Sequence, residues 1–373
     1  MSSLPVVVSM GDPAGIGPEI VMRALRERRA LREQLVVLGD VATLHRAARL
    51  SAPAGASDAA SDALVLAELA SLAHWPQRPP GAVALVQTGE ALPDLGWGVV
   101  SAAAGRAAAG AVRAGARAVL QGQARALVTA PLHKEALAAA GEPFPGHTEL
   151  LQALAAEHLG VPTTAVPVRM MLSAPGLATV LVSIHVALRD ALDAVRADAV
   201  LQTIRIAHAH FVRTGKAAPR IAVAGLNPHA GEGGLFGREE IEHIAPAVAA
   251  ARAQGIDASG PHPPDTVFMR ARQGVYDVVV AMYHDQGLIP VKLLGVEHGV
   301  NTTLGLPFVR TSPDHGTAFD IAGRGVASAA SLLGAIDAAL AATALSAGGC
   351  RGSRAAARCL RAAPPAGRGV PRA

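Results

Sequence analysis

The chain has 373 residues, of which 51% are hydrophobic and 17% charged, so it can bury a large core and is not a disordered protein. Its net charge of +4 comes from six arginines within residues 351–373, and the remainder carries about −2. Only 3% of the residues are aromatic, so no basic surface interleaved with aromatic rings points to a nucleic-acid partner.

Apolar, β-branched runs alternate with helical stretches along the chain. The pattern predicts strands at 4–9, 35–38, 82–86, 126–129, 179–183, 221–224 and 278–282. It predicts helices that begin at Pro18 and cover 102–119, 188–207 and 238–253. This alternation predicts an α/β fold with a largely parallel sheet.

Three histidines share one sequence context, because each follows an apolar strand. His185 comes after 179–183, His229 after 221–224 and His284 after 278–282. The carboxyl ends of parallel strands meet at one edge of a sheet, where ligands bind, so three imidazoles there can converge on one divalent metal ion. Taken singly, each is also an ordinary core or surface histidine. His147, between Pro145 and a predicted helix, is a fourth candidate.

Cationic and polar residues follow the third histidine. Lys292 and Arg310 offer hydrogen-bond donors to a phosphate or carboxylate, with Asn301 between them in the sequence. Ordinary surface charge is the alternative for both cations. Asp265 and Asp285 follow strands in the same region and are candidates for proton transfer or for orienting a histidine. A helix N-cap is an equal alternative for Asp265.

The glycine-rich segment 15–20 follows a strand and opens a helix, as a dinucleotide-binding loop does. Its third motif position is Ile20 rather than Gly or Ala, and Glu19 places a negative charge where a pyrophosphate would bind. We therefore interpret it as a tight turn into a helix. The second glycine-rich segment, 231–234, follows His229 and either closes over a ligand or turns the chain.

Residues 347–373 are rich in Gly, Arg, Ala and Pro and are expected to be disordered. Both cysteines, Cys350 and Cys359, lie there, so no disulfide framework is expected. The N-terminus lacks the basic and apolar regions of a signal peptide, and no run reaches the roughly 18 apolar residues of a membrane span. We expect a cytoplasmic protein with no membrane partner.

Eight ordered segments resemble the 4-hydroxythreonine-4-phosphate dehydrogenase family of the pyridoxal phosphate pathway. Together they extend over most of residues 5–345, and such a series in the right order is specific although each piece alone is weak. Ala187 departs from the family pattern, in which proline is expected. The segments are GDPAGIGPE at 11–19, TAPLHK at 129–134, PFPGHTELL at 143–151, HVALRD at 185–190, GLNPHAGEGG at 225–234, PPDT at 263–266, MYHDQGLIPVK at 282–292 and NTTLGLPFVRTSPDHGTAFDIAGRG at 301–325.

The resemblance implies two α/β/α domains with a central cleft, as in isocitrate and isopropylmalate dehydrogenases. It implies a first domain of residues 1–145 and 295–346 and a second of residues 146–294. It also implies a homodimer with the active site at the interface. One divalent ion (Zn, Mg, Mn or Co) would be bound by His185, His229 and His284, one of them from the partner subunit. Substrate contacts would fall on His147, Thr148, Lys292, Asn301 and Arg310.

The implied reaction is the NAD-dependent oxidation of 4-phosphooxy-L-threonine to 2-amino-3-oxo-4-phosphooxybutanoate, which then loses CO₂ to give 3-amino-2-oxopropyl phosphate. Asp265, Asp285 and Lys292 are the catalytic candidates. Dehydrogenation of 4-phospho-threonate or 4-phospho-erythronate on the same scaffold is the alternative. A non-catalytic ligand-binding protein would be expected to lack some of the metal or phosphate residues, and none is missing.

The resemblance also moves the expected cofactor site to the loop at 314–323. There, His315, Gly316, Thr317, Ala318 and Asp320 are similar to the adenosine-binding loop of isopropylmalate dehydrogenases. A carboxylate at Asp320 accepts hydrogen bonds from ribose hydroxyls and repels a 2′-phosphate, which favours NAD over NADP.

Replacing Asp320 by Lys should shift the preference from NAD toward NADP, because a cation attracts the 2′-phosphate that the carboxylate repels. The ratio of kcat/KM for the two cofactors measures this shift. An unchanged ratio would contradict the assignment of the loop.

Overall fold

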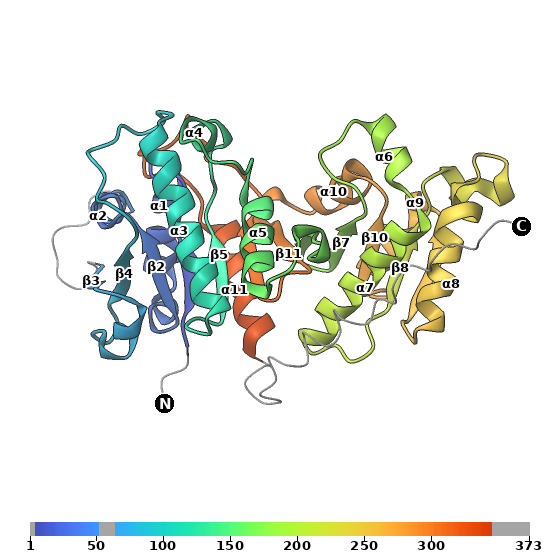
Figure 1. Ribbon diagram of the computed structural model, residues 1–373, viewed down its shortest axis with the longest axis horizontal. Helices are drawn as coiled ribbons and strands as arrows, with labels where there is room; N and C mark the ends of the chain where they lie inside the picture. Colours follow the sequence, from blue (N-terminus) through green and yellow to red (C-terminus); the bar gives the residue numbers. More distant parts are fainter. Residues whose placement is uncertain (1–3, 52–63, 345–373) are drawn as a thin grey trace, which may run out of the picture.

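The computed structural model describes residues 4–51 and 64–344, and the predicted tail at 347–373, with both cysteines, lies outside them. Its centre is a twelve-stranded sheet with the order β3-β4-β2-β1-β5-β12-β11-β6-β7-β10-β8-β9 (Figure 1). The strands are β1 (Val6–Ser9), β2 (Leu35–Gly39), β3 (Leu66–Leu69), β4 (Val83–Gln87), β5 (Ala126–Thr129), β6 (Arg169–Ala174), β7 (Leu177–Leu181), β8 (Ile221–Ala224), β9 (Ala258–His262), β10 (Val278–Ala281), β11 (Val300–Leu304) and β12 (Val309–Pro313).

Helices cover both faces of this sheet (Figure 1). The α-helices are α1 (Gly17–Glu27), α2 (Val41–Leu50), α3 (Ala102–Leu120), α4 (Lys134–Ala139), α5 (His147–Leu159), α6 (Leu188–Ala194), α7 (Ala197–Arg213), α8 (Ala245–Ala253), α9 (Pro264–Arg272), α10 (His284–Lys292) and α11 (Ala330–Ala344). Six 3₁₀- or π-helical turns are also present in the described part: η1 (Arg29–Glu33), η2 (Leu72–Gln77), η3 (Thr163–Ala165), η4 (Pro228–Gly234), η5 (Glu240–Ile244) and η6 (Val296–His298).

The sheet consists of two parallel halves joined by antiparallel strands. Strands β3, β4, β2, β1, β5 and β12 pair in parallel, as do β7, β10, β8 and β9. Between them, β11 pairs antiparallel with both β12 and β6, and β6 pairs antiparallel with β7. The expected α/β fold with a largely parallel sheet is confirmed.

Each half has one hydrophobic core on each face of the sheet. In β1, Val6 and Val8 face the core under α1, α2 and α11, whereas Val7 faces the core under α3 and α5. In β10, Val278 and Val280 pack with α7 and α8, whereas Val279 packs with α9 and α10. Alternate side chains of a strand point to opposite faces, so a strand that is apolar at every position makes two cores. Each half is therefore an α/β/α sandwich.

The observed element bounds depart from the expectations in several places. The helix expected over 238–253 includes the π-helical turn η5 before α8 begins at Ala245. The helix expected over 188–207 is two helices, because Val195 (ψ 86°) and Arg196 (ψ 154°) leave the helical region. The strand expected at 179–183 begins and ends two residues earlier, as β7. The sequence reading also missed the central strands β6, β11 and β12, whose polar residues such as Arg169, Asn301 and Arg310 interrupt the apolar pattern.

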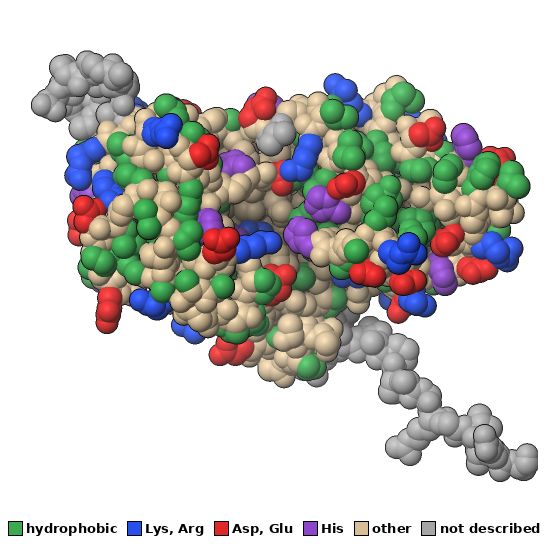
Figure 2. Space-filling view, turned by 90° about the horizontal axis from the view of Figure 1, so that it is seen from above, with side chains coloured by type: hydrophobic (Ala, Val, Ile, Leu, Met, Phe, Trp, Pro, Cys, Tyr) green, Lys and Arg blue, Asp and Glu red, His purple; other side chains and the backbone are tan. Residues whose placement is uncertain are grey.

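The carboxyl ends of several strands lie on one side of the molecule. The helices that follow β5, β7 and β10, namely α4, α6 and α10, all lie toward the top in Figure 1. Seen from above, this side is hollowed near its middle, and histidine, lysine and arginine side chains gather at the hollow (Figure 2). Among the described residues, no helix is both long and apolar enough to span a bilayer.

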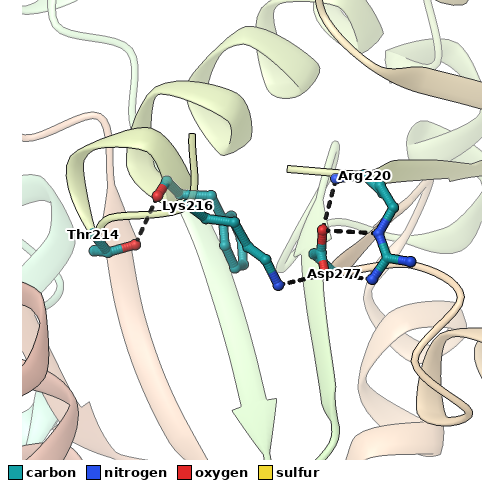
Figure 3. Close-up of polar contacts among 5 residues, drawn as sticks. Thr214, Lys216, Arg220 and Asp277 are labelled. Atoms are coloured by element: carbon teal, nitrogen blue, oxygen red, sulfur yellow. Dashed lines mark hydrogen bonds and ion pairs between the residues drawn. The ribbon is translucent and has the colours of Figure 1, made fainter. Parts of the chain in front are cut away.

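The opposite edge of the second half is held by an ion-pair cluster around Asp277 (Figure 3). Asp277 precedes β10, and its carboxylate accepts hydrogen bonds from Lys216 Nζ at 2.6 Å and from the backbone N–H of Arg220 at 2.7 Å. Burial raises the pKa of Asp277, but the hydrogen bonds from Arg220 and Lys216 outweigh it and bring the pKa to about 2. The cluster ties the start of β8 to the start of β10.

Replacing Asp277 by Asn should lower the free energy of unfolding by about 1–2 kcal/mol at neutral pH, allowing for the exposure of both cations. The pKa of this carboxylate is lowered on folding, so its contribution is complete above its ordinary pKa of 3.8 and is lost as the pH falls toward about 2. Urea unfolding of both proteins at several pH values measures this difference, which should narrow below about pH 4. A difference that stayed constant down to pH 3 would contradict it.

Candidate active site

The three candidate histidines follow three neighbouring strands. His185, His284 and His229 come after β7, β10 and β8, which are adjacent in the sheet in that order. The ring centroids of His185 and His284 are 5.7 Å apart. Both residues line a pocket of about 270 Å³ together with Ser183, Ile184, Val186, Leu188, Ala191, Tyr283 and Asp285. The structure thus brings two of the three imidazoles together.

Both imidazoles of this pair are suited to donate a nitrogen lone pair. Burial lowers the pKa of His185, and the positive charges of Lys134 and His284 lower it further. His284 Nδ1 lies 2.7 Å from Asp285 Oδ1, and such a carboxylate fixes the tautomer that leaves Nε2 free as a ligand. Ala187, where the resemblance leads us to expect proline, has φ −58°. Proline imposes nearly the same value, so this departure leaves the backbone unchanged.

His229 lies in a separate, left-handed turn. It has φ 52° at the start of six successive residues with positive φ in η4, and its ring lies against Phe236. Within residues 4–51 and 64–344, no group of three or more His, Cys, Asp or Glu side chains is close enough to hold a metal ion. In one chain, His229 therefore does not complete a site with His185 and His284.

Arg310 is a buried cation at the centre of the sheet. Only 3% of it is exposed, and its guanidinium donates to Thr129 Oγ1 at 2.7 Å and to Thr303 Oγ1 at 2.9 Å. Burial lowers the pKa of Arg310 to about 10, so it remains charged at neutral pH. No carboxylate within the described residues forms an ion pair with it. A buried charge without a counter-ion is costly, and a bound anion would offset that cost.

His147 lies beside Arg310 as the first residue of α5. Its Nε2 is buried without a hydrogen-bond partner in the described structure. Burial and then the charge of Arg310 hold the pKa of His147 well below its usual range, so the ring is neutral. Thr148 follows it in the first turn of α5, where backbone N–H groups are unpaired and favour anions.

The remaining polar candidates share one face of the central strands. Asn301 pairs with Ser312 across β11 and β12, and Arg310 lies two residues before Ser312, so Asn301 and Arg310 project from the same face. Lys292, at the end of α10, forms an ion pair of 2.7 Å with Asp314, two residues after Ser312. The five residues predicted to contact the substrate thus lie on α5, α10, β11 and β12.

The expected cofactor loop packs on the glycine-rich N-terminal turn. The carbonyl of Thr317 accepts a hydrogen bond from the N–H of Ile16 at 3.0 Å, and a Cβ on Gly15 would lie 3.0 Å from the Thr317 side chain. The ring of Phe319 stacks on His133 at 4.4 Å. Gly15 is thus required by close packing, which agrees with interpreting 15–20 as a turn into α1.

Within the same loop, His315 Nδ1 lies 3.1 Å from the carbonyl of Gly316, and Ala318 has φ 41°. Asp320 is exposed. It forms no hydrogen bond or ion pair with another described residue, so its carboxylate is accessible to a ligand.

The two candidate carboxylates differ in their surroundings. The side chain of Asp285 is 70% exposed and is hydrogen-bonded to His284. Asp265 is also exposed, in the first turn of α9, but it does not cap that helix; the N-cap residue is Pro263. Asp265 follows β9, which neighbours β8. The four adjacent strands β9, β8, β10 and β7 therefore lead to Asp265, His229, His284 and His185.

Sequence reasoning missed four residues that the structure places at this site. Lys134 and Glu149, from α4 and α5 of the first half, lie close enough to His185 to affect its pKa in opposite directions. Asp314 pairs with Lys292, and Thr129 receives two hydrogen bonds from Arg310. All four lie within the segments that resemble the family, but only the fold brings Asp314 next to Lys292.

The chain matches the family model described as "Pyridoxal phosphate biosynthetic protein PdxA" over residues 31–339. A 4-hydroxythreonine-4-phosphate dehydrogenase from Beijerinckia indica is 52% identical over 340 residues, which cover 89% of this chain and 93% of the relative. A D-threonate 4-phosphate dehydrogenase from Salmonella typhimurium is 46% identical, covering 89% of this chain and 97% of the relative.

A solved structure of 4-hydroxythreonine-4-phosphate dehydrogenase from Klebsiella pneumoniae has a TM-score of 0.78 and 43% identity, and covers 91% of this chain and 98% of its own. The chain therefore belongs to the PdxA family of pyridoxal phosphate biosynthetic proteins. It is a dehydrogenase, as expected, and the names of its relatives support a nicotinamide cofactor in general.

Replacing Arg310 by Met should abolish the binding of anions without destabilising the fold, because the change removes a buried charge that has no counter-ion. Inorganic phosphate should raise the Tm of the wild type but not that of R310M, and substrate KM should rise by ~10-fold or more.

The control is Arg169→Met, because the guanidinium of Arg169 is already bound by Thr203, Gln202 and the carbonyl of Val168. R169M should keep the response of the Tm to phosphate. An undiminished response in R310M would contradict the anion site.

Proposed function

We propose that the protein oxidises 4-phosphooxy-L-threonine with NAD, giving 2-amino-3-oxo-4-phosphooxybutanoate, which loses CO₂ to form 3-amino-2-oxopropyl phosphate. The observation that carries the proposal is the buried, uncompensated Arg310 beside the free Nε2 of His147. Relatives that cover most of this chain and are named for phosphorylated substrates support the same conclusion.

The substrate phosphate or carboxylate would bind where cationic and neutral donors converge. Arg310 presents a fork of N–H groups held in place by Thr129 and Thr303. His147 and Thr148 add donors at the N-terminus of α5. Lys292, paired with Asp314, and Asn301 contact the substrate from the other end of the same face.

The histidines fit a divalent metal ion. Two imidazoles are adjacent, and one is oriented by a carboxylate, as metal-bound histidines are. In a homodimer, a histidine of one subunit would complete the set in its partner, which agrees with His229 lying apart from the pair in one chain. Nitrogen ligands suit Zn²⁺ or Co²⁺, and substrate oxygens make Mg²⁺ or Mn²⁺ acceptable. When bound, the ion would stabilise negative charge on the substrate oxygen during oxidation.

The chain's own residues would manage the proton and the cofactor. Asp285 is engaged with His284, so we propose that Asp265 accepts the hydroxyl proton at its carboxylate and that Lys292 neutralises developing charge. The loop with His315, Gly316, Thr317, Ala318 and Asp320 would bind NAD through its adenosine end. We further propose that the protein is a cytoplasmic homodimer. Each subunit would have two domains, one formed by residues 1–145 and 295–346 and the other by residues 146–294.

A second candidate is the oxidation of D-threonate 4-phosphate. Relatives that carry this name are 45–46% identical to the chain. This substrate differs from the first at C2, where a hydroxyl replaces the amino group, and shares the phosphate and the oxidised carbon. The anion site therefore serves both.

An NADH-formation assay on the metal-free protein should separate these functions. We expect no turnover after dialysis against a chelator, and recovery with Zn²⁺, Co²⁺, Mg²⁺ or Mn²⁺ when 4-phosphooxy-L-threonine is present. A higher kcat/KM with D-threonate 4-phosphate would select the second candidate. Full activity in a preparation shown to be free of metal would contradict the proposed metal dependence. Inactivity on both substrates in the presence of metal would contradict the proposed dehydrogenase function.

A further inference from the structure

The turn that carries His229 has a strained backbone. From His229 to Gly233, five consecutive residues have φ between 42° and 81°. Three of them, His229, Ala230 and Glu232, are not glycine. Side chains with a Cβ are disfavoured in this left-handed region, and such strain persists only where neighbouring contacts hold it. The turn therefore needs an anchor.

The carboxylate of Glu240 is that anchor. Only 2% of Glu240 is exposed. Its Oε1 accepts hydrogen bonds from the backbone N–H groups of Leu226 and Asn227, both at 2.7 Å, and its Oε2 accepts one from Asn227 Nδ2 at 3.0 Å. A Cβ on Gly231 would lie 2.6 Å from Oε2. The carboxylate thus contacts the entry of the turn and fills the space beneath its middle.

A chain of buried hydrogen bonds connects this anchor to the other two histidines. Gln286, two residues after His284, accepts from the N–H of Met282 and donates to the carbonyl of Gly225, each at 2.7 Å. Ser183, two residues before His185, donates to the carbonyl of Met282 at 3.0 Å. The ends of β7, β10 and β8 are tied together in this way, and Glu240 extends the tie to the turn of His229.

We propose that Glu240 is a positioning residue for the metal centre. Its carboxylate holds the left-handed turn in the conformation that presents His229 to a divalent ion, without touching the ion itself. The inference rests on the proposed function, because it takes His229 as a ligand. It concerns a glutamate at the start of the π-helical turn η5, an element that is itself enriched at functional sites.

The test compares Co²⁺ binding by the metal-free full-length protein and its variants. Glu240→Ala removes all three hydrogen bonds, and Glu240→Gln keeps one acceptor but turns an amide toward Asn227. Titration followed by the visible absorption of Co²⁺ should show affinity reduced ~10-fold or more in E240A and by less in E240Q. The E240A spectrum should approach that of His229→Ala, the reference for a lost ligand.

Two controls separate positioning from general stability. Glu242→Gln removes a charge from η5, where Glu242 pairs with Arg238 at the surface, 2.6 Å away, and has no other ion-pair partner in the described part of the chain. Asp277→Asn lowers stability from the opposite edge of the sheet. Both should bind Co²⁺ as the wild type does.

Co²⁺ affinity in E240Q and, where it folds, E240A equal to that of the wild type would overturn the inference while leaving the metal proposal intact. Equal weakening in D277N would overturn it too, because affinity would then follow stability alone. A wild type that binds no Co²⁺ would overturn the proposed metal centre, and this inference with it.

Discussion

The antiparallel pairing of β11 with β12 on one side and β6 on the other joins the two halves of the molecule. Without it there would be two separate parallel sheets. The same strands carry Asn301 and Arg310, and the backbone of β12 continues to Asp314, the partner of Lys292. The pairing that makes one sheet also places these residues between the two halves. The fold and the candidate active site therefore depend on the same register of β11 with β12 and β6.

This placement has an energetic consequence. Arg310 lies at the centre of the sheet. Among the described residues, the hydroxyl groups of Thr129 and Thr303 accept its hydrogen bonds, and the neutral His147 lies nearby. Burying a charge in this way costs stability, and the cost is offset when an anion binds. The Asp277 cluster at the opposite edge has the reverse character, because each of its charged groups has a partner of opposite sign.

Backbone strain is also concentrated at the candidate site. The positive φ values of non-glycine residues fall at His185, in the His229 turn and at Ala318 of the expected cofactor loop. Each of these positions follows a strand or lies in a loop on the candidate site. Local preference does not favour these conformations, so tertiary contacts such as those of Glu240 must impose them.

The sequence by itself determined the α/β class, because apolar strands at 126–129, 221–224 and 278–282 are readable from β-branched residues alone. It also placed a histidine after each of three strands, and ordered segments gave the family. The pattern of apolar residues did not predict the central strands β6, β11 and β12, because Arg169, Asn301 and Arg310 interrupt it. Only the tertiary structure decided that β7, β10 and β8 are neighbours, that His229 lies apart from the other two histidines, and that Asp314 meets Lys292. Those facts depend on strand order and on contacts between residues distant in the chain, which local pattern does not encode.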